Sequence, residues 1–289
     1  MRQLILLGLI LLLFVDCSTN KGLTKNRPSK KIESLKFTAD SNAEIQFIYS
    51  DTVNNAFLRQ LRTENNLMLL IKDCKTDLEK LQAITNWTNS QWSHNGINQP
   101  TKSDALTILK EAKEGKQFRC VEYGVVLSSA LSSIGIKSRV IALKTQDVES
   151  VKYGAGHVLA EAYLSDISKW VMADGQFNII PSLNNVPLNC VEFQNSIIKG
   201  ENFDLIDKDG KVDKKRRNQY LDFIPQYLYY FDTRFDNRQG LINDHLAVDG
   251  KAKLMLTPLG SKSPTIFQVT GKIDYCLYTN STNDFYRRP

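Results

Sequence analysis

Residues 115–174 constrain the fold more than any other part of this 289-residue chain. An apolar segment begins near Cys120 and stops at Gly135, and its apolar residues recur at helical spacing. Two short strand-like runs, 157–164 and 170–174, follow a loop that contains glycines, and only five residues separate them. This spacing is typical of a β-hairpin. The stretch therefore predicts a helix followed by antiparallel strands.

Helices are expected mainly before this stretch. The residues from 51 to about 70 have a helical apolar pattern, and Thr76 with Glu79 forms a capping box at the start of the next helix. Ser103 is expected to cap a short helix that ends before residue 115. A strand is expected at 138–143. Helices first and antiparallel strands later indicate an α+β fold.

The region after residue 174 gives weaker signals. Residues 201–220 are charged and predict a loop, including the basic run 214–217, because such runs are usually solvated. An aromatic cluster at 220–235 is expected to be core or domain interface. Alternating stretches within 251–280 suggest further strands. We expect a core domain at 35–185 and a C-terminal extension at 186–289, partly β and of unknown role.

The start of the chain predicts export. The unbroken apolar run 4–15 is shorter than the ~20 residues that a membrane-spanning helix needs, and it suits the core of a signal peptide. It stops close to Cys17, which resembles a bacterial lipoprotein signal in which that cysteine is lipidated. Asp16 stands where such signals carry a small residue, so an ordinary secretory signal is the alternative. We expect a signal peptide at 1–17, a polar tether at 18–34 and a membrane-anchored lipoprotein of the bacterial cell envelope.

Composition limits the partners. The apolar content of 42% is enough for a substantial core, and the net charge of +6 is mild. Nucleic-acid binding is not expected, because no basic stripe alternates with aromatic residues in a folded segment. The cysteine spacings fit no zinc pattern, and neither a metal nor a cofactor is expected. Oligomeric state and any disulfide among Cys74, Cys190 and Cys276 stay open.

Three reactive side chains define the candidate site. Cys120 opens a helix, whose N-terminal partial positive charge stabilises a thiolate. His157 starts one strand of the expected hairpin and Asp174 ends the other, so antiparallel pairing brings them close. Asp174 would then fix the orientation of the imidazole, and His157 would hold the thiolate as an ion pair.

The order of these fragments resembles the transglutaminase-like superfamily, which has a papain-type fold. The matching features are Cys120 at a helix start, Gly-Ile-x-x-Arg at 135–139, Gly-His at 156–157 with Glu161, and a Trp-Val strand that ends in Asp174. The resemblance covers about residues 75–180. It implies a transglutaminase-like core with N-terminal helices and an antiparallel sheet carrying His and Asp. It also implies a Cys120–His157–Asp174 catalytic triad that transfers acyl groups through a thioester.

The resemblance also implies an oxyanion hole. The backbone N–H of Cys120 would contribute to it, and an upstream side chain would assist. Trp87, Gln91 and Trp92 are the candidates, and spacing does not choose among them. His94 and His245 lie in polar segments and are interpreted as solvated surface residues.

Two classes of function remain. The first is an exported cysteine-dependent hydrolase or acyltransferase acting on peptide or protein amides, with hydrolysis as the default because water needs no acceptor site. The second is a catalytically inactive transglutaminase-like scaffold that serves as a cell-surface binding module. A role as an accessory domain in cell-wall or carbohydrate processing is a further alternative.

Overall fold

A computed structural model describes residues 34–241 and 245–289. The expected signal peptide at 1–17, the lipidation site Cys17 and nearly all of the tether lie outside the described residues. Within the described residues, no helix is both long and apolar enough to cross a bilayer. The described part falls within one compact unit. The expected boundary at residue 185 stays a prediction.

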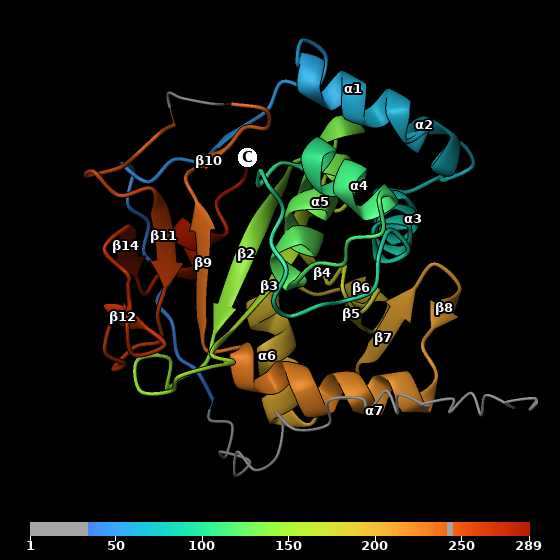
Figure 1. The fold of residues 1–289 in the computed structure, drawn as a ribbon. Coiled ribbons are helices and arrows are strands. Elements are labelled where there is room, and N and C mark those ends of the chain that lie inside the picture. The colour runs from blue at the N-terminus through green and yellow to red at the C-terminus, as the bar shows by residue number, and fades with distance from the viewer. Residues whose placement is uncertain (1–33, 242–244) are drawn as a thin grey trace, which may run out of the picture. The chain divides into compact units, whose positions relative to one another are not determined.

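Five helices precede the main sheet (Figure 1). The capping box at Thr76 and Glu79 is confirmed, because each side chain accepts a hydrogen bond from the other residue's backbone N–H. The fourth helix is capped one residue later than its sequence suggests. Asp104 rather than Ser103 accepts the backbone N–H of Thr107. The helices are α1 (Ala56–Glu64), α2 (Leu67–Leu70), α3 (Asp77–Asn89), α4 (Ala105–Lys113) and α5 (Cys120–Ser133).

The central sheet has six strands in the order β14-β11-β9-β2-β3-β4. Neighbouring strands are antiparallel except for β11 and β14, which pair in parallel. Helices followed by this largely antiparallel sheet confirm the α+β prediction. The strands are β2 (Ser138–Lys144), β3 (Gly156–Leu164), β4 (Lys169–Ala173), β9 (Tyr230–Arg234), β11 (Lys253–Leu256) and β14 (Cys276–Thr279).

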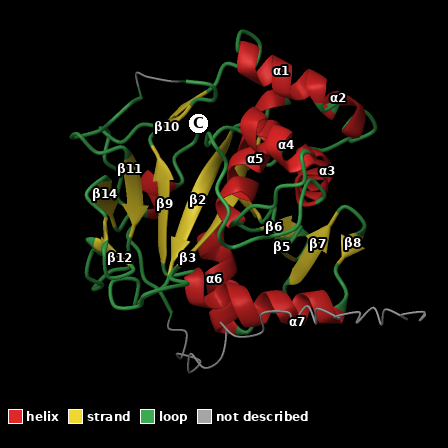
Figure 2. Ribbon diagram, in the orientation of Figure 1, coloured by secondary structure: helices red, strands yellow, loops and turns green. Residues whose placement is uncertain are grey.

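Helices cover both faces of the sheet (Figure 2). Small side chains on β3, including Ala160 and Ala162, let α5 pack closely on one face. The other face packs against α6 (Cys190–Lys199) and α7 (Lys214–Phe223), through residues such as Phe193 and Tyr220. Alternate residues of β3 therefore serve two separate cores.

The segment before α1 contributes only a short strand, β1 (Ile48–Tyr49), which pairs with β10 (Asp236–Asn237). Residues 201–220 are not a loop, since they contain β7 (Asp204–Asp207) and most of α7. The basic run begins α7 because Asp213 caps that helix by accepting the backbone N–H of Arg216.

The remaining elements are short. They connect or flank the central sheet, and β5, β6, β7 and β8 form a second, four-stranded sheet. Their bounds are β5 (Ile180–Leu183), β6 (Val186–Pro187), β8 (Gly210–Lys211), η1 (Ile224–Tyr227), β12 (Ile266–Phe267), β13 (Gly271–Lys272) and α8 (Thr282–Phe285).

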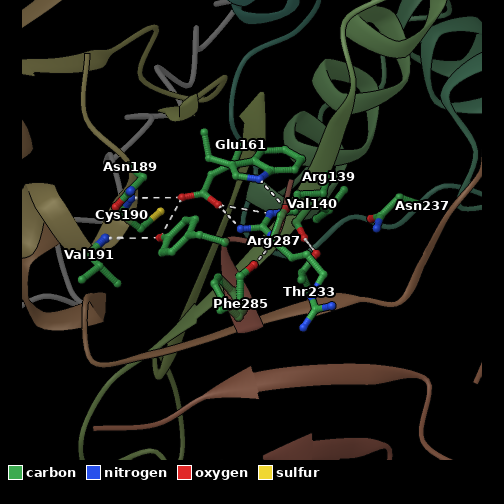
Figure 3. A network of polar contacts seen from close by, with 12 residues as sticks. Arg139, Val140, Glu161, Asn189, Cys190, Val191, Thr233, Asn237, Phe285 and Arg287 are labelled. Atoms are coloured by element: carbon green, nitrogen blue, oxygen red, sulfur yellow. Dashed lines mark hydrogen bonds and ion pairs between the residues drawn. The ribbon is translucent and has the colours of Figure 1, made fainter. Parts of the chain in front are cut away.

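A buried ion pair joins the sheet to the C-terminal residues (Figure 3). The guanidinium of Arg139 on β2 contacts the carboxylate of Glu161 on β3 at 2.7 Å, and neither side chain is exposed. Arg139 also donates to the carbonyl of Phe285 at 2.6 Å. The second Glu161 oxygen accepts from the backbone N–H of Cys190 and from the hydroxyl of Tyr286. Every charge in this network is thus paired or hydrogen-bonded.

Candidate active site

Cys120 is the first residue of α5, and its side chain is half-buried. The carboxylate of Glu122 lies two residues further on and would repel a thiolate. Arg119 offsets that charge, because its guanidinium contacts the Glu122 carboxylate at 2.7 Å. The Glu122 carboxylate also accepts the backbone N–H of Arg119. Because Arg119 offsets the negative charge of Glu122, the backbone N–H groups at the start of α5 can stabilise a thiolate on Cys120.

Gly124 sets the position of the thiol. It lies one helical turn after Cys120, where α5 presses against β3. A Cβ atom added there would lie 2.8 Å from a methyl group of Val158 and 3.1 Å from the carbonyl of Leu159. Only glycine fits this approach without displacing the strand. The close contact brings the start of α5 to the start of β3, where His157 is located.

His157 and Asp174 meet as expected from the hairpin. His157 is the second residue of β3, and Asp174 directly follows β4. The Nε2 atom of His157 lies 2.7 Å from Oδ2 of Asp174, and both side chains are buried. The side chain of Cys120 lies close enough to the same ring to raise the pKa of His157, and the Asp174 contact leaves Nδ1 to face it. The structure therefore brings together all three residues that the sequence singled out.

The environment of His157 favours its charged form. Burial alone would lower the pKa of the imidazole, but the Asp174 carboxylate and the Cys120 side chain outweigh burial and raise the pKa of His157 to about 10. This environment therefore favours an imidazolium at neutral pH, which would donate to Asp174 and face the thiol. This charge is what a thiolate nucleophile requires.

The raised pKa makes folding stability depend on pH. The stabilisation from protonated His157 is fully present below the ordinary value of 6.5 and is lost as pH rises through about 10. The free energy of unfolding of the wild type should therefore fall towards that of His157→Gln between these two values. Urea unfolding of both proteins across this range measures the difference. A difference that does not change with pH would contradict the assigned charge state.

Aromatic side chains from beyond residue 174 enclose His157. The ring of Phe223 lies edge-on at a centroid distance of 5.1 Å, and the rings of Tyr227 and Phe177 lie at 5.9 and 6.1 Å. Tyr220 donates its hydroxyl to Oδ2 of Asp174 at 3.1 Å. The sequence placed the 220–235 cluster in the core or at an interface but did not connect it to the site. Only the contact itself identifies these residues, because they are distant in sequence.

The three oxyanion candidates differ in their surroundings. Gln91 donates its side-chain amide to the carbonyl of Trp87 and to the hydroxyl of Ser90. Trp87 is half-buried and packs against the hydrophobic core that includes α5. Trp92 is buried, and its ring lies 4.4 Å from the ring of Tyr123 and 5.7 Å from that of Phe118. Both rings flank Cys120 in the chain, which places Trp92 near the start of α5.

The other histidines and cysteines lie in different environments. Partial desolvation and the positive charge of His157 lower the pKa of His94, so this exposed residue lies nearer the site than its polar loop indicated. Cys74, Cys190 and Cys276 are free thiols, and burial raises the pKa of each. No disulfide joins the described cysteines.

A polar cavity of about 440 Å³ borders the turn that follows Asp174. Phe177 forms part of its wall and also contacts the ring of His157, so the cavity adjoins the site. Most of the other lining side chains are amides or charged groups: Asn86, Asn89, Gln176, Asn178, Asp207, Asp209, Arg216 and Gln219.

One family model matches the part of the chain that holds the candidate site. Residues 68–175 match the model of the Transglutaminase-like superfamily, which confirms the resemblance drawn from the sequence motifs. That segment contains Cys120 and His157 and extends one residue past Asp174. A comparison with curated proteins found no match.

Three solved structures that resemble part of this chain have related descriptions. A protein from Cytophaga hutchinsonii, named as a candidate cysteine protease, is 14% identical over 45% of this chain and 46% of its own, with a TM-score of 0.33. A transglutaminase (TGase) structure is 16% identical over 41% of this chain and 30% of its own, with a TM-score of 0.29. A candidate protease from Parabacteroides distasonis is 14% identical over 42% of this chain and 29% of its own, also with a TM-score of 0.29. The matched regions span less than half of each of those chains.

Proposed function

We propose that this protein is an exported cysteine-dependent hydrolase or acyltransferase that acts on peptide or protein amides through a thioester. The proposal starts from a transglutaminase-like segment at 68–175, which points to a cysteine-dependent enzyme family. The single observation that carries it is the contact between Nε2 of His157 and Asp174 at 2.7 Å, with Cys120 as the other partner of the same ring.

The geometry supports a definite sequence of steps. The thiolate of Cys120 attacks the amide carbonyl carbon, and a tetrahedral intermediate forms. The imidazolium of His157 then gives its Nδ1 proton to the leaving amine as the C–N bond breaks. The product is a thioester on Cys120. Neutral His157 next takes a proton from water, or from an acceptor amine, as that nucleophile attacks the thioester and restores the thiolate.

Charge on the intermediate needs donors aimed at the oxygen. The backbone N–H of Cys120 belongs to the first turn of α5 and has no acceptor within the helix. The indole N–H of Trp92 is buried beside residues that flank Cys120, and no acceptor among the described residues contacts it. We propose that these two groups form the oxyanion hole.

A peptide or protein substrate is consistent with the surroundings of the triad. The adjoining 440 Å³ cavity offers amide side chains on α3 and on the turn that follows Asp174, and such groups bond peptide N–H and C=O groups in either direction. Export and membrane attachment through Cys17 belong to the same proposal and rest on the apolar run at 4–15. Nucleic acid is not part of the proposal.

Selective alkylation tests the reactivity of the thiol. Iodoacetamide near neutral pH should modify Cys120 at least about tenfold faster than Cys74, because the imidazolium stabilises one thiolate and burial disfavours the other. Peptide mass spectrometry of the purified protein measures both rates. His157→Gln should slow Cys120 towards the rate of Cys74.

The same reaction on intact cells tests export. A membrane-impermeant thiol reagent should reach Cys120 without lysis once any outer membrane has been made permeable. Modification only after the cytoplasmic membrane is broken would contradict export. Equal, slow alkylation of both cysteines in the purified protein would instead contradict the catalytic role and favour a binding scaffold.

A further inference from the structure

One oxygen of Asp174 has two side-chain partners. Oδ2 accepts from Nε2 of His157 at 2.7 Å and from the hydroxyl of Tyr220 at 3.1 Å. The other oxygen, Oδ1, accepts the backbone N–H groups of Gln176 and Phe177 at 3.0 and 3.2 Å. Neither Asp174 nor Tyr220 is exposed to solvent. Four donors therefore hold the carboxylate in one orientation, and Tyr220 and His157 share one oxygen.

Sharing that oxygen has a chemical consequence. A hydrogen bond to a charged carboxylate draws negative charge towards the donor. The hydroxyl of Tyr220 therefore weakens the pull that Oδ2 exerts on the proton of His157. Without it, the same carboxylate would bind the imidazolium proton more tightly, and His157 would be a weaker acid towards a leaving amine.

The helix that carries Tyr220 is tied to the same turn. Arg216, one turn earlier on α7, donates to the carbonyls of Phe177 and Asn178 at 3.2 and 3.1 Å. Its guanidinium also pairs with Asp207, so its position is fixed from two sides. Tyr220 and the turn that presents Asp174 are thus held as one unit. This helix lies outside the segment 68–175 that matches the family model.

We propose that Tyr220 is a positioning residue of the catalytic centre, which orients the Asp174 carboxylate and moderates its hydrogen bond to His157. This proposal rests on the proposed function only in assigning Cys120, His157 and Asp174 as a triad. Burial and the charge of Asp174 raise the pKa of Tyr220 well above its ordinary value, so the hydroxyl stays protonated around neutral pH.

A matched pair of variants separates this role from ordinary stabilisation. Tyr286 donates its hydroxyl to Glu161 at 3.1 Å, the same distance at which Tyr220 donates to Asp174, but Glu161 pairs with Arg139 and not with a histidine. Tyr220→Phe and Tyr286→Phe each remove one such hydroxyl and keep the ring. Only the first should affect His157.

The measurement is the NMR resonance of the Nε2 proton of His157 at pH 7. The chain has three histidines, so His157→Gln assigns the signal. In Tyr220→Phe the resonance should move downfield, because the hydrogen bond to Asp174 strengthens. In Tyr286→Phe it should stay in place. An unchanged or upfield-shifted resonance in Tyr220→Phe, or an equal shift in both variants, would overturn the proposal.

A second measurement uses the wild type and needs no variant to fold. The hydroxyl proton of Tyr220 should be protected from exchange at low temperature and should show a nuclear Overhauser effect to the Nε2 proton of His157. A rapidly exchanging hydroxyl without that cross-peak would refute the hydrogen bond. Neither readout needs a substrate, so a chain with no amide-cleaving activity could still show both. Failure of the proposed function and failure of this inference are therefore distinguishable.

Discussion

Replacing Cys120 by alanine is expected to lower kcat for amide cleavage or transfer by a factor on the order of 10⁶, the scale seen when a triad nucleophile is removed. The thioester needs the sulfur atom, and His157 has nothing to activate in its absence. Trp92 and the first turn of α5 stay in place in this variant, so substrate binding should change little. The measurement is cleavage of a mixed peptide library, followed by mass spectrometry, together with the mass of any acyl-enzyme.

Cys74→Ala is the matched control, because it removes a half-buried thiol that is not one of the three triad residues. Its activity should equal that of the wild type. Cleavage that persists in Cys120→Ala would contradict the nucleophile assignment. A wild-type protein that binds library peptides but never forms an acyl-enzyme would support the scaffold alternative instead.

Replacing Glu161 by alanine is expected to lower the free energy of unfolding by about 3–5 kcal/mol, the usual cost of breaking a buried ion pair on one side. Arg139 would stay buried with an uncompensated charge (Figure 3). The backbone N–H of Cys190 and the hydroxyl of Tyr286 would each lose an acceptor. Urea unfolding followed by circular dichroism measures the loss.

Two further variants make this result interpretable. Lys211→Ala breaks an ion pair with Asp204 of similar length, 2.9 Å, but Lys211 is 71% exposed, so the expected cost is at most about 1 kcal/mol. The double variant Arg139→Met with Glu161→Leu removes both charges and should be more stable than Glu161→Ala alone. If Glu161→Ala lowers the free energy of unfolding no more than Lys211→Ala does, the buried Arg139–Glu161 network does not stabilise the fold as inferred.

Local signals explain why the centre of the site could be predicted. Each local feature is predicted from only a few residues of sequence. These features are the helix end at Gly135, the loop before His157 and the short link between the strands of the hairpin. Pairing of β3 with β4 then brings His157 near Asp174 without any knowledge of the rest of the chain. The capping box at Thr76 and Glu79 was found in the same way.

Non-local contacts explain what could not be predicted. Tyr220 lies 46 residues after Asp174, on a helix that begins with four consecutive basic residues and shows little apolar periodicity. The charge pattern of residues 214–217 predicts a loop. The segment forms α7 instead, because Asp213 caps its first turn and Arg216 bonds to the turn after Asp174. The proposal of Trp92 rather than Gln91 likewise rests on which side-chain N–H already has an acceptor.

The place of β2 in the sheet has a consequence for the order of events during folding. β2 pairs with β3, which follows it closely, and with β9, which begins more than 80 residues after β2 ends. Closing so long a loop is slow compared with forming α5 or the hairpin. We therefore expect α5 and the hairpin, which carry Cys120, His157 and Asp174, to form before the segment with Tyr220 and β9 docks onto β2.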